Sequence, residues 1–231
     1  MESFNIKSIG ECMIPTILKG FDYLVNVRKL TESTIRQFNL GYCDSQGETY
    51  IGAEFTGTLP TLPATMRNST LFPIMDLYNN CVAVSARPLG SAQTKYVNTV
   101  YDKADHLYGL SVTWQDCLKE QKVYVVEGNL SMLTPWQHGL KNIVAMLGSN
   151  FSMTQLCLLS RFVKNITFIP DGDKAGINFV EKLRKNIPSK FYDSDIQFSY
   201  IQLPNGNDPD DYFKQHTLEE FKALPENKLV L

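Results

Sequence analysis

The chain has 231 residues, of which 43% are hydrophobic, and its formal net charge at pH 7 is −2. This length and composition suffice for one or two compact domains with a buried core. Because neither half of the sequence is basic overall, any nucleic-acid contact must come from a local cluster of cations rather than from a general positive field.

The cysteines and the apolar runs exclude two further classes. The five cysteines are scattered and include no C-x-x-C pair, so a zinc ribbon is not encoded and reduced thiols are expected. The first residues lack the basic-then-apolar pattern of a signal peptide, and no apolar run approaches ~18 residues. We therefore expect a cytoplasmic protein with no membrane partner.

The first part of the chain, up to residue 110, predicts a separate α+β unit. The segment 30–38 indicates a short helix capped by Thr31. Short β-type runs broken by Gly and Pro follow at 49–55, 69–77 and 80–90. The segment 99–110 is expected to lead into the second domain.

The second part alternates predicted strands and helices. Apolar runs rich in β-branched residues predict four strands at 123–128, 141–147, 165–171 and 196–204. Helices are predicted between them, from about Met132 to His138, from Ser152 to about Val163, and from Ala175 to Asn186. Strands separated by single helices imply right-handed crossovers and a largely parallel sheet. The domains we expect are 1–110, 111–207 and a short helical tail at 208–231.

Acidic residues follow three of the four predicted strands. Glu127 ends the first strand, Asp171 ends the third, and Asp173 lies in the next loop before a helix. Ligands of an open parallel sheet bind beyond the carboxyl ends of its strands, where these carboxylates would meet. Such a cluster is unfavourable unless a cation neutralises it. Oxygen ligands with room for water and phosphate favour Mg²⁺ or Mn²⁺.

A second acidic set follows the fourth strand, in the segment LPNGNDPDDYF at 203–213. Asp208 and Asp210, with Asp211, would join the same edge if the fourth strand belongs to the same sheet. Two carboxylate clusters on one rim suit two divalent ions ~3.5–4 Å apart, which can hold the attacking and leaving oxygens of a phosphoryl transfer.

Each acidic motif also has a simpler interpretation. Asp171-x-Asp173 alone is as often a helix cap, Glu127 alone is most often a turn residue, and DPDD alone is a helix-start signal. A calcium loop does not fit, because Ala175 and Lys182 occupy positions at which it needs ligands. The occurrence of acids at three strand ends together favours the metal site.

Basic and aromatic residues adjoin one another after the run at 80–90. Arg87 and Lys95 flank a glycine-containing loop, and Tyr96 follows at once. Phosphate contact from a cation and base stacking on an aromatic ring are a common combination in single-strand binding. Taken without other motifs, these residues favour the alternative, an exposed charged loop beside a core tyrosine.

The acidic pattern resembles that of the Toprim fold shared by topoisomerases, primases and some nucleases, whose marks are a Glu after the first strand and a D-x-D after the third. VVEG and PDGDKAG supply both. The chain further resembles the RNA-polymerase domain of bacterial and phage DnaG-type primases over about residues 28–215. The segments that carry this resemblance, in the family's order, are LTESTIRQFNLGY, STLFPIMD, ARPLG, TKYVN, HLYGL and LPNGNDPDDYF.

The resemblance implies a DNA primase, a DNA-templated RNA polymerase that synthesises short RNA primers on single-stranded DNA by two-metal nucleotidyl transfer. The implied fold is α/β, with an N-terminal mixed α+β subdomain, then a Toprim-type, largely parallel sheet with flanking helices, and a short helical C-terminal tail. The implied partners are the single-stranded template, ribonucleoside triphosphates, a replicative helicase and a separate zinc-binding module.

The same resemblance assigns roles to individual residues. The catalytic metal ligands would be Glu127, Asp171 and Asp173. The second acidic pair at the metals would be Asp208 and Asp210. The residues that line the groove for template and nucleotide would be Arg67, Arg87, Lys95 and Tyr96.

Three positions depart from the family pattern. Ser131 stands where the family motif E-G-Y-M-D has its Asp, and Gln37 and Ser69 stand where family arginines are expected. These changes remove one metal ligand or nearby acid and leave fewer cations for template or nucleotide. The chain also lacks the family's zinc module and most of its helical tail and helicase-binding part. Such compactness would suit a phage origin, with the host cytoplasm as its location.

Two alternative functions stay open. A metal-dependent Toprim nuclease would use the same acids, although the motifs of the first half argue against it. A non-catalytic template-binding or helicase-stimulating replication factor would account for the departures at Ser131 and Gln37. A topoisomerase is disfavoured, because so short a chain holds no extended gate region for a strand-passing tyrosine.

Overall fold

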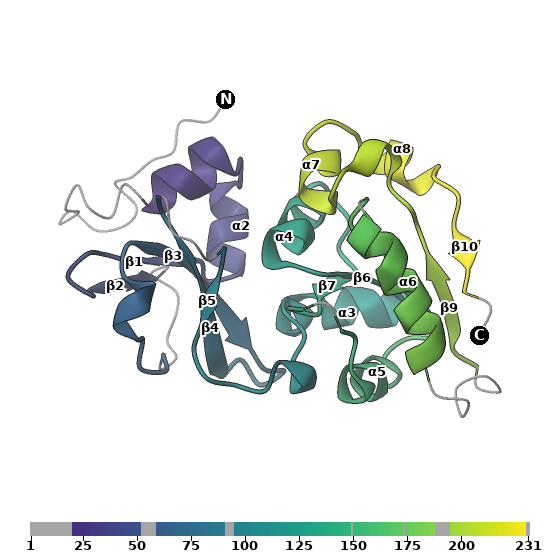
Figure 1. Ribbon diagram of the computed structural model, residues 1–231, viewed down its shortest axis with the longest axis horizontal. Coiled ribbons are helices and arrows are strands. Elements are labelled where there is room, and N and C mark those ends of the chain that lie inside the picture. The colour runs from purple at the N-terminus through teal and green to yellow at the C-terminus, as the bar shows by residue number, and fades with distance from the viewer. Residues whose placement is uncertain are drawn as a thin grey trace. The chain divides into compact units, whose positions relative to one another are not determined.

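The computed structural model describes residues 20–51, 59–90, 95–148, 150–172, 174–187 and 195–229. The chain divides into two compact units, Met1–Tyr101 and Asp102–Leu231, whose elements are labelled in Figure 1. Of the helices that the structure describes, none has both the length and the apolar character needed to cross a membrane.

The first unit contains a five-stranded antiparallel sheet with the strand order β2-β1-β3-β4-β5. Its strands are β1 (Gly41–Cys43), β2 (Thr49–Ile51), β3 (Ser69–Met75), β4 (Cys81–Pro88) and β5 (Val97–Asn98). The predicted strands at 69–77 and 80–90 are confirmed as the long pair β3 and β4. Of the predicted run at 49–55, residues 49–51 form β2 and the rest lies outside the described residues.

Short helical segments accompany this sheet. They are the π-helix η2 (Tyr23–Val27), the helix α2 (Glu32–Gln37) and the 3-10 helix η3 (Ala64–Met66). The predicted cap of α2 is confirmed, because the Thr31 hydroxyl accepts a hydrogen bond from the Thr34 backbone N–H at 3.2 Å. The buried cluster between sheet and loops consists of Cys43, Met66, Leu71, Val84 and Ala86.

The second unit contains the largely parallel sheet that the sequence predicts, with the strand order β10-β9-β8-β6-β7. Its strands are β6 (Lys122–Val126), β7 (Ile143–Ala145), β8 (Asn165–Phe168), β9 (Gln197–Tyr200) and β10 (Asn227–Lys228). The four predicted strands run parallel, and β10, which the sequence analysis did not predict, pairs antiparallel with β9. Because β6 lies between β7 and β8, the loops that follow β6 and β8 are neighbours.

The helical segments of the second unit are η4 (Lys103–Asp105), α3 (Leu110–Glu120), α4 (Asn129–Gln137), α5 (Met153–Leu159), α6 (Lys174–Asn186), η6 (Pro204–Gly206), α7 (Pro209–Phe213) and α8 (Leu218–Lys222). The predicted start of α5 is confirmed by a capping box between Ser152 and Gln155. The helix ends before the predicted Val163, because the next residues turn and the Asn165 amide bonds to the Gln121 carbonyl to begin β8.

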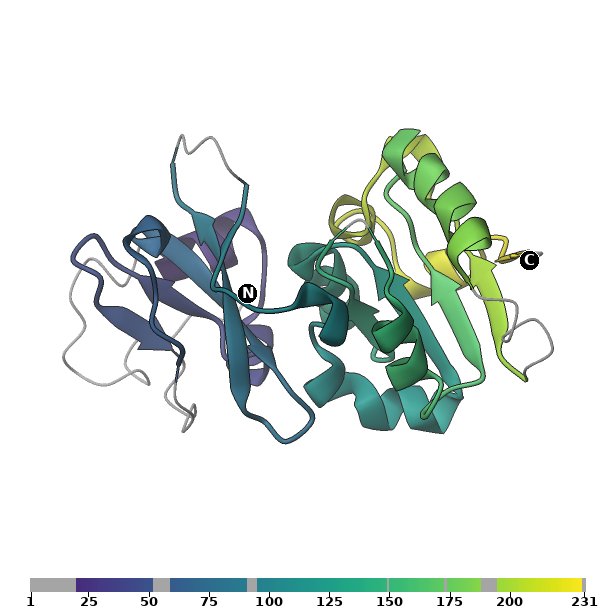
Figure 2. The same cartoon turned by 60° about the horizontal axis from the view of Figure 1, so that its bottom comes forward.

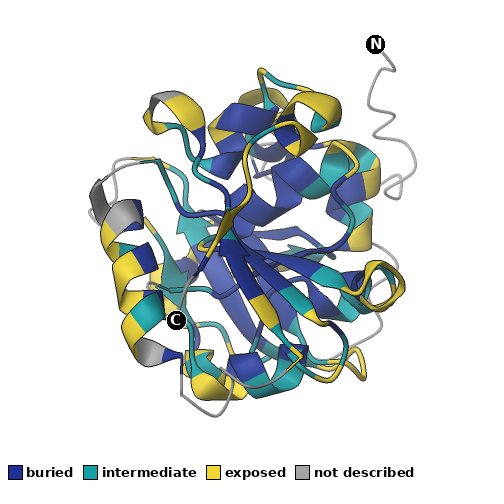
Figure 3. Cartoon of the chain, turned by 90° about the vertical axis from the view of Figure 1, so that its right-hand side faces the viewer, coloured by how far each residue is buried: buried dark blue, intermediate teal, exposed yellow. Residues whose placement is uncertain are grey.

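The two faces of the parallel sheet pack against different helices. Val123, Val125 and Phe168 belong to a buried cluster with apolar residues of α3, α5 and α6, and α6 lies along β8 and β9 in Figures 1 and 2. On the other face, the ring centroids of Tyr124 and of Phe221 in α8 are 5.6 Å apart. Figure 3 shows buried strands between helices whose outer faces are exposed.

The C-terminal residues belong to this second unit. We expected the first domain to end at residue 110, and the two compact units of the structure divide between Tyr101 and Asp102. The backbone of Tyr108 already forms a bridge with Ala145 in β7, so the residues after Tyr101 belong to the second unit. The residues expected to form a short helical tail pack onto the second unit, with α7 against α4 and β10 beside β9.

A polar cluster fastens the C-terminal segment to the sheet. The Glu226 carboxylate accepts hydrogen bonds from Lys122, Thr167 and Ser199 at 2.6, 2.9 and 2.5 Å. Burial alone would raise the pKa of Glu226, but these donors outweigh burial and hold its pKa below the usual value. Burial alone would likewise lower the pKa of Lys122, and the bond to Glu226 leaves that pKa raised.

The sign of the Glu226 shift fixes a pH dependence. A carboxyl pKa that is depressed in the folded protein stabilises the fold above its unfolded-state pKa, and the contribution is lost as the pH falls through the folded value. We expect Glu226→Gln to lower the free energy of unfolding at about pH 7 by about 1 kcal/mol, a modest value because the carboxylate is partly exposed.

Urea unfolding at about pH 7 and about pH 3 checks this expectation. Glu219→Gln, an exposed acid in the first turn of α8, serves as the control and should change little. Wild type and Glu226→Gln should converge at the lower pH, and a difference that stays the same at both pH values would contradict the assigned role.

Candidate functional site

Two of the predicted acidic residues lie at the same carboxyl edge of the parallel sheet. Glu127 follows β6 directly, and Asp171 follows β8 after two further residues. The strands are neighbours, with Val125 opposite Phe168, and the Ile169 amide donates to the Val125 carbonyl at 2.9 Å. Glu127 is exposed and Asp171 is half-buried. The third predicted ligand, Asp173, lies outside the described residues.

A backbone contact joins the loop after β8 to the loop after β9. The Gly172 amide donates to the Asn207 carbonyl at 3.0 Å. A Cβ on Gly172 would lie 2.6 Å from the carbonyl carbon of Gly206 and 2.8 Å from the nitrogen of Asn207, so the two loops approach this closely only around a glycine. Since Asp171 precedes Gly172 and Asp208 follows Asn207, this contact holds the two acidic segments together.

A second glycine shapes the same turn. Gly176 lies in the first turn of α6, and a Cβ at this position would overlap the carbonyl oxygen of Asp171. The two glycines of the segment FIPDGDKAG therefore serve different contacts. The missing side chain of Gly172 leaves room for the loop at Gly206 and Asn207, and that of Gly176 leaves room for the backbone of Asp171.

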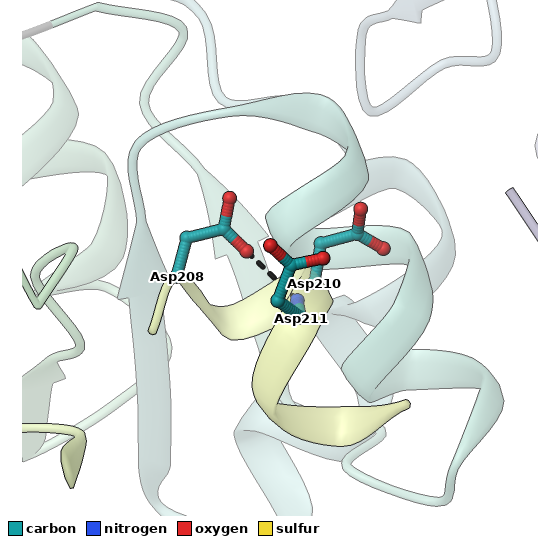
Figure 4. A group of neighbouring side chains, drawn as sticks. All are labelled: Asp208, Asp210 and Asp211. Carbon is teal, nitrogen blue, oxygen red and sulfur yellow. Dashed lines mark hydrogen bonds between the residues drawn. The ribbon is translucent and has the colours of Figure 1, made fainter. Parts of the chain in front are cut away.

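Three carboxylates stand around the first turn of α7 (Figure 4). Ligand oxygens of Asp208, Asp210 and Asp211 all lie within 4.8 Å of one another. Asp208 caps the helix, because its Oδ1 accepts a hydrogen bond from the Asp211 amide at 2.8 Å. Its second oxygen accepts no hydrogen bond within the described part of the chain and can serve as a ligand.

Asp210 is the buried member of this group, with 3% of its surface exposed. Its Oδ1 accepts a hydrogen bond from the hydroxyl of Thr134 in α4 at 2.5 Å, and its Oδ2 pairs with the Lys214 ammonium at 2.8 Å. Burial alone would lower the pKa of Lys214, and the bonds to Asp210 and Asp211 leave it raised. Asp210 therefore joins α7 to α4, and a metal ion at this carboxylate would compete with Lys214.

Of the two partners of Asp210, the sequence spacing could indicate Lys214 but not Thr134. Lys214 follows Asp210 by four residues, a spacing at which helical side chains of opposite charge meet. Thr134 is 76 residues away, and nothing in the sequence connects it with Asp210.

In the first unit, Arg87 and Tyr96 lie together. The Arg87 guanidinium is 5.4 Å from the centroid of the Tyr96 ring, and its Nη1 donates to the Tyr96 hydroxyl at 3.3 Å. The Tyr96 ring meets Phe72 edge-on, with centroids 6.1 Å apart. Burial raises the pKa of Tyr96, against the opposing effect of Arg87. Tyr96 is thus anchored in the core and supports Arg87.

The other two cations predicted for the groove, Lys95 and Arg67, are exposed. Lys95 is exposed, one residue before Tyr96. Arg67 is exposed after η3, beside Gly47 of the turn between β1 and β2. Across the described residues, no hydrogen bond, ion pair or ring contact joins Arg67 to Arg87, so a groove that they share stays a prediction.

Two residues that the sequence analysis did not single out join Arg87. The guanidinium groups of Arg28 and Arg87 lie over the ring of Tyr23, 5.6 and 5.9 Å from the ring centroid. The segment holding Tyr23 is a π-helix, so its side-chain spacing does not follow the α-helical pattern that the sequence analysis used.

The three departures from the family pattern occupy ordinary structural positions. Ser131 is buried in α4, and Gln37 is the last residue of α2. Ser69 is buried at the start of β3, and its hydroxyl donates to the Arg67 carbonyl at 3.2 Å.

Known proteins are similar to this chain in sequence or in fold. Residues 124–213 match the model of a family described as Toprim-like. A DNA primase of Rickettsia typhi is 30% identical over 261 residues, which cover 100% of this chain and 42% of the relative. A DNA primase of Synechococcus elongatus is 28% identical over 231 residues, which cover 89% of this chain and 33% of the relative. The chain thus spans less than half the length of these relatives.

Solved structures of primase catalytic domains have a similar fold. The DnaG primase catalytic domain bound to ssDNA superposes with a TM-score of 0.76 at 23% identity, over 94% of this chain and 74% of that one. The E. coli primase catalytic core superposes with a TM-score of 0.74 at 25% identity, over 91% of this chain and 73% of that one. The family match and the fold show a Toprim-like domain in the second unit. With the ordered motifs and the relatives, they confirm the resemblance to the DnaG-type primase catalytic core.

The contacts of Asp210 predict a structural effect that needs no metal. In metal-free buffer, Asp210→Asn should lower the free energy of unfolding by about 2 kcal/mol, because it removes the buried partner of the half-buried Lys214 and leaves only the exposed carboxylate of Asp211 to pair with it. Thr134→Val should lower it by about 1 kcal/mol through loss of one bond to a buried carboxylate. Urea unfolding measures both, with the exposed Asp211→Asn as a control that should change little. Full stability of Asp210→Asn in this buffer would show that Asp210 does not fasten α7 to α4.

Proposed function

We propose that the chain is the catalytic core of a DNA primase, a DNA-templated RNA polymerase that makes short RNA primers on single-stranded DNA. The observation that carries the proposal is the contact between Gly172 and Asn207, which brings the loops of Asp171 and Asp208 together at the strand end adjoining Glu127. The relatives named DNA primase and the solved DnaG catalytic cores support it.

The ligand set of the proposed centre fits a hard divalent cation, Mg²⁺ or Mn²⁺, because it consists of carboxylates. The proposed catalytic ligands are Glu127, Asp171 and Asp173. Asp208 would add its second oxygen, and Asp210 would contribute only when its ion pair with Lys214 opens. Bound there, divalent cations would supply the positive charge that stabilises the attacking and leaving oxygens of nucleotidyl transfer.

The residues of the chain contribute mainly by positioning. The helix cap at Asp208 and the glycine contact at Gly172 fix the carboxylates before any substrate binds, so that little reorganisation is needed during the reaction. The proposed substrates are ribonucleoside triphosphates. The template strand would bind the cations of the first unit, of which Arg87 is the best anchored and Lys95 and Arg67 the more exposed.

The proposal extends to partners and location. The matched relatives are more than twice as long as the part that this chain covers. We propose that a replicative helicase and a separate zinc-binding module act with this core, as the resemblance implies. We place its action in the cytoplasm, or in the host cytoplasm if a phage encodes it.

Primer synthesis provides the direct test. On a mixed single-stranded template with ribonucleotides and Mg²⁺, we expect Glu127→Gln to reduce primer synthesis at least on the order of 100-fold, because it removes one carboxylate from the metal centre. The side chain is exposed, so the thermal unfolding temperature should not change. Glu219→Gln, an exposed acid of α8, is the matched control and should retain full synthesis.

The same assay separates the alternatives. Cleavage of labelled single-stranded DNA with Mg²⁺ and no ribonucleotides would favour the Toprim nuclease. Template binding without synthesis, alone and with a candidate helicase, would favour the non-catalytic replication factor. Undiminished primer synthesis by Glu127→Gln would refute the assigned metal centre.

A further inference from the structure

We propose that a lysine-lined pocket at the amino end of the parallel sheet binds the phosphate groups of a small phosphorylated compound. The pocket has a volume of about 310 Å³, which is at the lower end of the range typical of small-molecule sites. Four lysines from separate segments of the second unit line it, namely Lys119 of α3, Lys122 of β6, Lys141 before β7 and Lys222 of α8. We call it the lysine pocket.

The lysine pocket lies at the end of the sheet opposite to the acidic edge. Lys122 is the first residue of β6, and Asn142, which also lines the pocket, directly precedes β7. Glu127 follows the last residue of β6, so the length of this strand, roughly 16 Å at ~3.3 Å per residue, separates the pocket from the proposed metal centre. The inference therefore does not depend on the proposed function.

Lys141 is the half-buried cation of the lysine pocket. Its ammonium lies 3.4 Å from the centroid of the Trp136 ring and donates a hydrogen bond to the Trp136 carbonyl at 3.0 Å. Burial lowers the pKa of Lys141, and the nearby charge of Asp116 opposes this effect without outweighing it. In the part of the chain that the structure describes, no carboxylate forms an ion pair with this ammonium. A positive charge that is partly removed from water and has no paired acid favours an anionic ligand.

Lys119 and Lys222 supply two further charges at the rim. Both side chains are exposed, and among the described residues neither forms a hydrogen bond or an ion pair. Lysines in the last turn of a helix often bind its terminal carbonyls, but here other donors occupy those carbonyls. The Leu118 carbonyl of α3 accepts a hydrogen bond from the Gln121 side chain at 2.8 Å, and backbone amides close the end of α8. Both ammonium groups can therefore turn toward an anion in the pocket.

The acids around the lysine pocket do not cancel its positive charge. Lys122 is paired with Glu226, so this pair is neutral as a whole. The other three lysines stand against two lining acids of α3, Asp116 and Glu120, which leaves a balance of one positive charge. The two acids also disfavour a long polyanion such as a nucleic-acid strand, because a strand that passes α3 would meet them. A compact anion that fits within the pocket is favoured instead.

The type of cation favours phosphate over carboxylate as the ligand group. Lysine binds phosphate as a compact point charge, whereas the planar carboxylate is best matched by the paired donors of arginine. Each basic side chain found to line the pocket is a lysine. Two sources share this phosphate chemistry, free pyrophosphate and the phosphate groups of a nucleotide, and the experiment separates them.

Tryptophan fluorescence provides a local test, because the Trp136 ring contacts the Lys141 ammonium. The metal-free protein is titrated with pyrophosphate, with ATP and with citrate as a carboxylate probe. We expect a saturable change with at least one of the two phosphates that Trp114→Phe keeps and Trp136→Phe loses. Tighter binding of ATP would assign the site to a nucleotide, and tighter binding of pyrophosphate would assign it to the free anion.

Calorimetry with lysine variants locates the bound phosphate. We expect Lys141→Gln to weaken binding at least about tenfold, because it removes the half-buried charge. Lys222→Gln should weaken it about threefold, since an exposed cation contributes less. Lys185→Gln, an exposed lysine in the last turn of α6, is the matched control and should keep the affinity within about twofold. Thermal unfolding verifies that the variants are folded, and Lys222→Gln decides the test if Lys141→Gln is not.

Three results would overturn the inference. They are the lack of saturable binding of either phosphate, citrate binding as tight as that of the phosphates, and phosphate affinity that neither Lys141→Gln nor Lys222→Gln changes. Because every readout is binding in metal-free buffer, the outcome is separate from primer synthesis. A chain that makes no primers can still bind phosphate here, and a primase can lack this site.

Discussion

The close approach of Gly172 to Gly206 and Asn207 is the constraint on which the acidic edge of the sheet depends. The two loops follow different strands, and their carboxylates would separate if electrostatic repulsion alone decided their positions. One backbone hydrogen bond of 3.0 Å and the absence of a side chain at Gly172 hold them together. The repulsion is thus opposed by the fold, and a cation that binds there gains a preorganised set of oxygens.

The fold treats its carboxylates in two ways. Asp210 and Glu226 are each matched by a lysine and by hydroxyl donors, and both fasten C-terminal segments to the body of the second unit. Glu127 is exposed at the strand end, and Asp208 uses one oxygen to cap α7. Acidic residues with internal partners support the structure, whereas those with a remaining oxygen at the edge are the better candidates for metal ligands. The same distinction applies to cations, since Arg36 is paired with Glu32 and Arg87 is held on tyrosine rings.

The parts of the fold that the sequence predicts well are those set by local patterns. The alternation of apolar strands and capped helices from Val123 onward indicates the parallel sheet, and Thr31 and Ser152 mark helix starts that the structure confirms. The order of the acidic motifs indicates which strand ends carry carboxylates. What the sequence could not show depends on contacts between distant residues, such as the bond between Thr134 and Asp210 and the pairing of β10 with β9.

The first unit was harder to predict because its informative geometry is irregular. The π-helix at Tyr23–Val27 shifts the side-chain spacing by one residue, so periodicity gives no sign that Tyr23 and Arg28 meet. Likewise, the sequence shows only that Tyr96 is an aromatic residue beside a charged loop. Its contacts with Phe72 and Arg87 in the structure show that it supports the arginine. These contacts have no counterpart in composition or spacing, and they decide which cations are held in place.

The most direct test of a metal centre at the joined loops is a titration of the metal-free protein with Mn²⁺. The loss of the electron paramagnetic resonance signal of the free ion reports the binding. If the loops joined at Gly172 form one centre, Asp171→Asn and Asp208→Asn should each weaken the same bound ion by at least about tenfold, as expected for loss of a charged ligand. Binding that neither substitution affects would contradict the central claim that these two loops together build the metal centre.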